Sequence, residues 1–179
     1  MKNKEQKWIR AILHRGSQDA ADMLVRAYYD EIYVYVYRQV GNKEDAMDLT
    51  QEGFIAALQS LHTYDAKRAS FRTWLYHVVS HKVIDARRRG RLDVVPIEEI
   101  EVSGEKDFTE ELLNQELLSR IEAYICDADP AIQEVFRMHL YGERSFPEIA
   151  AATGQPEAKI KAWYYRLLQK IRKEFSDDE

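Results

Sequence analysis

The spacing of apolar residues along the chain predicts helices almost throughout. A long helical pattern begins at Ser17 and repeats its apolar positions every three or four residues along one face: Leu24, Tyr28, Ile32 and Tyr35. Residues 32–37 alternate β-branched and aromatic side chains, as a strand would. We still predict a helix there, because no other segment offers a comparable strand partner, and we expect Gly41 and Asn42 to cap it.

Two further amphipathic helices follow in the first half of the chain. The first covers roughly residues 43–62, with an apolar stripe interrupted by Gln51: Met47, Phe54, Leu58 and Leu61. The second runs from about Ser70 to Arg89 and carries apolar residues along one side: Phe71, Leu75, Val79 and Val83. Three amphipathic helices with short links predict one compact bundle.

Residues 92–108 interrupt this rhythm with Pro96, Gly104 and a run of acidic side chains. Such a segment is typical of an interdomain linker. Because the helical pattern resumes near Thr109, we predict an all-α fold of two small helical bundles joined by an acidic linker. The expected domains are residues 1–91 and 109–179, with the linker at 92–108.

The last third of the chain carries the signals of a helix-turn-helix. Helices are expected from 109 to about 126, and after an Asp129-Pro130 start to about 141. Ser145 and Glu148 then have the spacing of a capping box. A tight turn at 153–155 separates that short helix from a last one at about 156–175. Two short helices joined by a glycine-containing turn form the plan that places a helix in the DNA major groove.

Charge is distributed unevenly along the chain, whose formal net charge is −5. Residues 1–91 carry 16 basic and 11 acidic side chains, whereas residues 92–119 carry one lysine and nine acids. Residues 120–179 carry 9 basic and 11 acidic side chains, three of the acids being the final three residues. The acidic total therefore does not exclude a nucleic-acid partner.

Composition limits where the protein acts. A single cysteine, Cys126, excludes an intramolecular disulfide and favours the cytoplasm. The charged first residues are not followed by the apolar stretch of a signal peptide. Since no apolar run approaches the roughly 18 residues of a membrane span, we expect no membrane insertion.

The last helix separates into two faces. One is apolar and is expected to pack inward: Ile160, Tyr164, Leu167, Ile171 and Phe175. The other face carries Lys159, Trp163, Arg166, Lys170 and Lys173, while Lys161 and Arg172 flank the apolar stripe from its other side. Between Pro156 and Lys173, six basic residues stand against one acid, Glu157. Lysines on such a face can neutralise phosphates, and arginine can also donate to guanine. The pattern favours binding to duplex DNA.

Two groups of residues on the helix ending at Arg89 each allow two interpretations. The terminal basic run, residues 87–91, can either complement the helix dipole or bind a phosphate backbone. Trp74 and Tyr76 suit either the core or stacking with single-stranded bases.

No chemistry of an enzyme is evident in the sequence. His77, His81 and Asp85 are spaced four residues apart, but a metalloprotease helix needs Glu directly after the first His, where Val78 stands. No second cluster of ligands lies nearby in the sequence. We also find no nucleophile–base pair and no phosphate loop, so we predict no catalytic residue, no metal and no cofactor.

Several stretches together resemble the extracytoplasmic-function (ECF) group of sigma-70 factors. Residues 44–54 contain D-L-T-Q-E-G-F, which is similar to sigma region 2.2. Residues 70–76, S-F-R-T-W-L-Y, and 85–89, D-A-R-R-R, resemble regions 2.3 and 2.4. Residues 145–150, S-F-P-E-I-A, resemble region 4. In the last helix Lys161 and Arg166 keep the family's residues, whereas Ala162, Trp163 and Leu168 replace its Ser, Arg and Arg.

The resemblance implies a role for each set of residues. One set would bind RNA polymerase core at the β′ clamp helices: Asp48, Gln51, Glu52 and Phe54. A second, with the loop at 64–69, would melt the −10 promoter element and hold its single strand: Trp74, His77, His81, Lys82, Arg87, Arg88 and Arg89. A third would contact the duplex −35 element: Lys159, Lys161, Ala162, Trp163, Arg166 and Lys170.

The resemblance also implies partners: RNA polymerase core, including its β subunit, promoter DNA and an anti-sigma factor. The alternative is a stand-alone helix-turn-helix transcriptional regulator. That alternative leaves D-L-T-Q-E-G-F and the basic run at 87–91 unexplained.

Overall fold

The computed structural model describes residues 2–92 and 115–175, which are helical apart from short connections. The first group of helices contains four α-helices: α1 (Lys2–Arg15), α2 (Gln18–Val40), α3 (Lys43–Ser60) and α4 (Phe71–Arg88). A single 3₁₀ turn, η1 (Leu61–Thr63), follows α3. The second group contains α6 (Gln115–Cys126), α7 (Pro130–Leu140), α8 (Phe146–Thr153) and α9 (Glu157–Phe175). The predicted all-α fold is confirmed, and no described helix is long and apolar enough to cross a membrane.

The linker predicted at 92–108 lies outside the described residues, apart from Leu92. The same holds for the start of the helix predicted from Thr109, although that helix does end at Cys126 as expected. The strand-like run at 32–37 lies within α2, so its prediction as helix is confirmed.

Local capping chemistry sets most helix boundaries. The side chains of Ser17 and Ser70 accept hydrogen bonds from backbone N–H groups at the starts of α2 and α4. Asp129 caps α7 in the same way, and Ser145 forms the predicted capping box with Glu148. Gly41 ends α2 with a φ of 69°, a left-handed conformation that glycine adopts without steric cost.

The first four helices form one bundle around α2 and α4. The apolar stripe predicted for the helix from Ser70 is fully buried: Phe71, Leu75, Val79 and Val83. Helix α1 was not predicted. It packs against α2 through Ile9, and the Tyr28 hydroxyl donates to the Glu5 carboxylate beneath it.

Of the apolar stripe predicted for residues 43–62, Phe54 and Leu61 are buried and Leu58 is half-buried. Met47 is 46% exposed, so its prediction as a core residue is wrong. The buried positions are mostly smaller: Ala46, Leu49, Thr50, Gly53 and Ala57, with Phe54. A Cβ added at Gly53 would lie 2.9 Å from Val79 Cγ2, so these small residues let α3 approach α4 closely.

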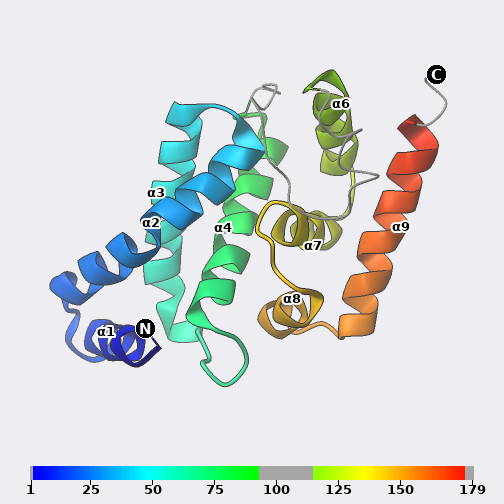
Figure 1. Cartoon of the computed structure of the whole chain (residues 1–179). Coiled ribbons are helices and arrows are strands. Elements are labelled where there is room, and N and C mark those ends of the chain that lie inside the picture. Colours follow the sequence, from blue (N-terminus) through cyan, green and yellow to red (C-terminus); the bar gives the residue numbers. More distant parts are fainter. Residues whose placement is uncertain (1, 93–114, 176–179) are drawn as a thin grey trace.

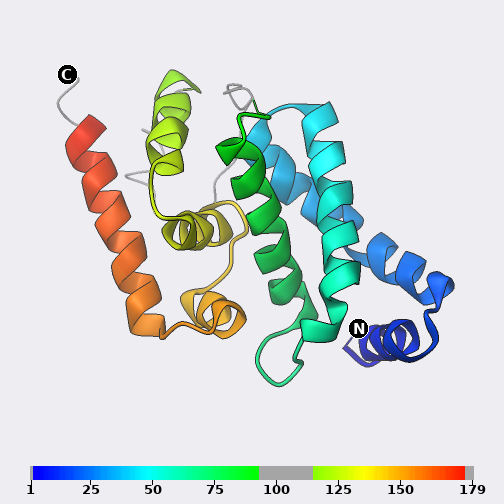
Figure 2. The same ribbon diagram turned by 180° about the vertical axis from the view of Figure 1, so that it is seen from behind.

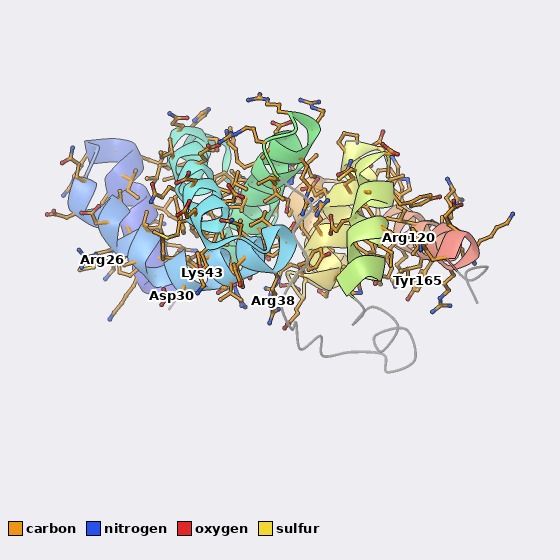
Figure 3. All side chains as sticks on the ribbon, turned by 90° about the horizontal axis from the view of Figure 1, so that it is seen from above. Arg26, Asp30, Arg38, Lys43, Arg120 and Tyr165 are labelled. Carbon is orange, nitrogen blue, oxygen red and sulfur yellow. The ribbon has the colours of Figure 1, made fainter. Side chains whose placement is uncertain are left out.

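The two groups of helices pack against each other through α4. Helices α7 and α8 lie between α4 and α9, as both ribbon views show (Figures 1 and 2). Helix α9 is therefore at the edge of the molecule farthest from α1 (Figure 1). Seen from above, Arg38 at the end of α2 lies where the two groups meet (Figure 3), and its Nη1 is 3.0 Å from Glu143 Oε1. We call this packed state the compact arrangement.

Candidate nucleic-acid interface

Helices α8 and α9 form the helix-turn-helix that the sequence predicts. Gly154 ends α8 with a φ of 70°, and its N–H donates to Ala150 O. Ile149 and Ile160 are both fully buried and hold the two helices together. The short turn, with its left-handed glycine, thus fixes the angle at which α9 leaves α8.

Basic, solvent-exposed residues flank the apolar stripe of α9 on both sides, with Lys159, Arg166 and Lys170 on one side and Lys161 on the other. Ile160, Leu167 and Ile171 are buried as predicted. Four of the residues predicted to contact DNA are exposed: Lys159, Lys161, Arg166 and Lys170. The other two, Ala162 and Trp163, are half-buried. Lys159, Arg166 and Lys170 lie in one row that can follow a phosphate backbone and reach base edges.

Trp163 is half-buried, and part of its ring is covered by a neighbouring lysine. Lys159 Nζ lies 4.7 Å from the centre of its ring, a cation–π contact. The same ammonium is 3.0 Å from Gln155 Oε1, and Lys161 Nζ is 2.7 Å from Glu157 Oε1. These contacts order the first turns of α9 before any ligand binds.

On α4 the residues predicted for the −10 element have different environments. Trp74 is 8% exposed and packs against Phe71 and Tyr64, with ring centres 5.7 and 5.5 Å apart. Of the two alternatives for Trp74, the core is therefore the one found here. Arg88 and Arg89 are exposed, and Lys82 is half-buried.

The two histidines of α4 face the second group of helices. His77 Nδ1 contacts Glu134 Oε1 on α7, and His81 Nε2 is 3.2 Å from Glu134 Oε2. The hydrogen bond with Glu134 raises the pKa of the His81 imidazole above its ordinary value. In the compact arrangement both histidines are directed at protein.

Helix α3 carries a separate exposed surface. Asp48 and Gln51 are exposed, and neighbouring positions on the same face are apolar: Met47 and Ile55, 46% and 55% exposed. Glu52 Oε1 is 2.7 Å from Arg91 Nη2, and this hydrogen bond holds the pKa of the Glu52 carboxyl below its usual range. Phe54, predicted to touch a partner, is only 6% exposed because it packs inside the bundle. We refer to Met47, Asp48, Gln51, Glu52 and Ile55 as the α3 face.

Comparison with known proteins identifies the family. Residues 24–92, which span α2 to α4, match the family model described as sigma-70 region 2. The ECF RNA polymerase sigma factor BldN of Streptomyces coelicolor is 32% identical over 170 residues, which cover 91% of this chain and 63% of BldN. The ECF RNA polymerase sigma factor SigW of Bacillus subtilis is 28% identical over 176 residues, covering 91% of this chain and 92% of SigW. The chain belongs to the ECF group of the sigma-70 family.

A solved structure shares the fold of this ECF sigma factor. CnrH, in complex with the cytosolic domain of CnrY, superposes with a TM-score of 0.60 at 20% identity. The match covers 99% of this chain and 98% of CnrH. The chain spans less than two thirds of the length of BldN but nearly all of SigW and CnrH.

The ECF sigma factor also contains a buried polar network that its sequence did not reveal. Glu122 Oε2 on α6 is 3.0 Å from Arg137 Nη2 and 3.7 Å from Arg87 Nε. Tyr141 donates to Glu122 Oε1 at 2.5 Å, and Arg87 Nη2 donates to the Gln39 carbonyl. Because Arg87 and Gln39 belong to the first group of helices and the others to the second, this network joins the two.

Burial and charge act in opposite directions within this network. Burial alone would raise the pKa of the Glu122 carboxyl, but Arg137 and Arg87 outweigh it and hold that pKa below its ordinary value. The side chains of Arg87, Glu122 and Arg137 are only 7%, 5% and 0% exposed. Arg87, predicted to contact DNA, is thus occupied by protein in the compact arrangement.

Proposed function

We propose that this ECF sigma factor binds RNA polymerase core and directs it to promoters, where it recognises the −35 element and helps to melt the −10 element. It is a binding subunit rather than an enzyme, and it acts in the cytoplasm. The observation that carries this proposal is the α3 face, which combines polar residues of the D-L-T-Q-E-G-F segment with the apolar residues on either side of it, Met47 and Ile55, and is separate from the basic helix α9.

The two surfaces have different chemistry and suit different partners. The α3 face combines carboxylates with two exposed apolar side chains, a mixture typical of protein interfaces. Helix α9 combines lysines with Arg166 and suits duplex DNA. A protein with both can hold polymerase and promoter at once.

The −10 element would be held by α4 and the loop before it. Arg88 and Arg89 are exposed at the end of α4 and can contact phosphates, and Lys82 is half-buried beside them. His77 and Arg87 are covered by Glu134 and Glu122 in the compact arrangement and become available when the second group of helices moves away from α4. His81 also contacts Glu134, but its side chain is already 56% exposed. We therefore expect the two groups to separate during promoter opening.

An anti-sigma factor is a further proposed partner. CnrH, which shares the fold, was solved in complex with the cytosolic domain of a second protein, CnrY. A protein that binds the compact arrangement would keep α4 covered and the sigma factor inactive.

The stand-alone regulator is the competing function, and one experiment separates the two. Run-off transcription from a genomic promoter library is measured with core polymerase, with and without the protein. We expect new transcripts that share spaced upstream motifs. No transcripts, no stable complex with core and tight binding of isolated duplex DNA would instead establish the stand-alone regulator.

A further inference from the structure

His77, His81 and Glu134 bring three metal-ligand atoms together where the two groups of helices meet. The histidines are four residues apart on α4, which places both imidazoles on one face, with ring centres 4.5 Å apart. Glu134 comes from α7, 57 and 53 residues further along the chain. One nitrogen from each histidine and one carboxylate oxygen lie within 4.8 Å of one another.

The donor set suits a particular class of metal ion. Two imidazoles and one carboxylate are preferred by Zn²⁺ and its neighbours among the divalent transition metals, whereas Ca²⁺ and Mg²⁺ prefer oxygen alone. Three protein ligands leave a fourth position for water. Ligand atoms around a tetrahedral zinc ion are about 3.3 Å apart, given bonds of about 2.0–2.1 Å. His81 Nε2 and Glu134 Oε2, 3.2 Å apart, already have that spacing.

The surroundings allow an ion to enter and hold it once bound. The His81 side chain is 56% exposed and the His77 side chain 25%, so the site opens to solvent on the α4 side. Glu134, 6% exposed, forms its inner wall. Asp85, one turn beyond His81, adds negative potential and is held by Arg88 at 3.0 Å. Glu134 therefore offsets part of the charge of a divalent cation directly, while Asp85, already paired with Arg88, contributes only at longer range.

We propose that His77, His81 and Glu134 bind one divalent transition-metal ion of the zinc type and that this ion ties α4 to α7. The sequence-based expectation of no metal depended on Val78 standing where a metalloprotease helix has Glu and on the lack of a second cluster of ligands nearby in the sequence. The fold supplies that ligand from a distant segment.

The consequence for transcription rests on the proposed function. An ion that binds all three residues binds only the compact arrangement, so it multiplies the ratio of compact to open protein by one plus the ratio of the ion's concentration to its Kd. At a hundred times the Kd, the compact arrangement is favoured about a hundredfold. The same histidines are then withheld from the −10 element. The metal therefore acts as an inhibitor of this sigma factor.

Metal binding is tested first, on the full chain, by isothermal titration with ZnCl₂ and by the visible spectrum with CoCl₂. We expect one equivalent to bind and Co²⁺ to show the absorption of a four-coordinate nitrogen and oxygen site. His81→Gln and Glu134→Gln should each weaken binding at least about tenfold, the lower end of what loss of even an outer partner costs a metal site. His14→Gln, an exposed histidine on α1, is the matched control and should bind as the wild type does.

Glu134→Gln distinguishes a metal site from a hydrogen-bonded pair. The substitution keeps the shape of the side chain and a hydrogen-bonding oxygen but gives a poor zinc ligand. Without metal, the circular dichroism spectra of His81→Gln and Glu134→Gln should match that of the wild type. Unfolding is then excluded as the cause of weaker metal binding. The proposal is overturned if no saturable one-to-one binding occurs, or if His81→Gln and Glu134→Gln bind as tightly as His14→Gln.

Whether the metal ion holds α4 against α7 is tested by measuring the distance between the two groups of helices. Spin labels at Arg26→Cys and Glu174→Cys, in a Cys126→Ser background, report the separation of α2 from α9. Zn²⁺ should narrow the distance distribution in this protein and leave it unchanged when Glu134→Gln is added. A metal that binds without narrowing the distribution would overturn the tie.

Transcription gives a separate readout that can fail on its own. Added Zn²⁺ should reduce run-off transcription by the wild-type holoenzyme and have a smaller effect with Glu134→Gln, which corrects for zinc acting on polymerase itself. Equal inhibition of both would overturn the inhibitory role. If the protein supports no transcription even without Zn²⁺, the proposed function fails, and titration still decides the metal site.

Discussion

Arg137 is fully buried and faces Glu122, with Nη2 of the arginine 3.0 Å from Oε2 of the glutamate. Both residues belong to the second group of helices, yet Arg87 and Gln39 of the first group complete their surroundings. The ion pair therefore belongs to the second group of helices, but it is shielded from solvent only in the compact arrangement. Its energetics and those of the exposed surfaces lead to four predictions.

Arg137→Met should destabilise the protein by about 3–5 kcal/mol, because it leaves the buried Glu122 carboxylate without its nearest counter-charge. Urea denaturation followed by circular dichroism measures the change. Glu143→Ala is the control, since it removes the half-exposed pair with Arg38 and should cost at most about 1 kcal/mol. Similar losses for the two variants would contradict the importance of burial.

Glu122→Gln should be less stable than the wild type at neutral pH, and the difference should shrink in acid. The pKa of the Glu122 carboxyl is lower in the folded protein than its ordinary value of 4.5. The charged carboxylate therefore contributes its full stabilisation above about 4.5 and loses it as the pH falls through the lower folded value.

The difference in unfolding free energy between Glu122→Gln and the wild type is measured by urea denaturation at several pH values between about 7 and 3.5. Glu174→Gln, on the exposed end of α9, should differ little from the wild type over the whole range. A gap between Glu122→Gln and the wild type that stays constant with pH would show that the carboxylate charge is not responsible.

Glu52→Arg should weaken binding to RNA polymerase core at least about tenfold, or about 1.4 kcal/mol, because it reverses a charge on the α3 face. The measurement is affinity for core in a fluorescence titration. Asp22→Arg makes the same charge change on the exposed side of α2 and should leave affinity unchanged. Unchanged affinity for Glu52→Arg would remove the α3 face from the polymerase interface.

Arg166→Ala should reduce activity on promoters that depend on a −35 element, by the roughly 1–3 kcal/mol of one arginine–base contact. The comparison is between a duplex template with the −35 element and a pre-melted template without it. Only the first should be affected, and Arg10→Ala on α1 should affect neither. Equal losses on both templates would mean that Arg166 acts in some other step.

Much of the fold could be predicted because its signals are local. Ser17, Ser70, Asp129 and Ser145 start helices through bonds to residues two or three positions away, so sequence spacing alone identifies them. The same is true of the buried stripe of α4. On α3 only Met47 was misjudged, because a large apolar residue was taken as core where close packing against α4 selects small residues such as Ala46 and Gly53.

The features that join the two groups of helices could not be predicted from spacing. Glu134 meets His77 across 57 residues, and Glu122 meets Arg87 across the acidic segment. Nothing in the local sequence marks such glutamates as partners of a distant helix. Helix α1 was missed for a related reason, since its main cue is the packing of Ile9 against a core that forms elsewhere.

Gly53 is the sixth residue of the D-L-T-Q-E-G-F segment, and a Cβ added there would lie only 2.9 Å from Val79 Cγ2 on α4. One side of this segment is the α3 face, and the other is locked to the helix proposed to hold the melted strand. The segment therefore connects the proposed polymerase-binding surface rigidly to α4. The distance between polymerase and the position where the DNA strands separate would then be fixed by the packing of α3 against α4, before the sigma factor meets a promoter.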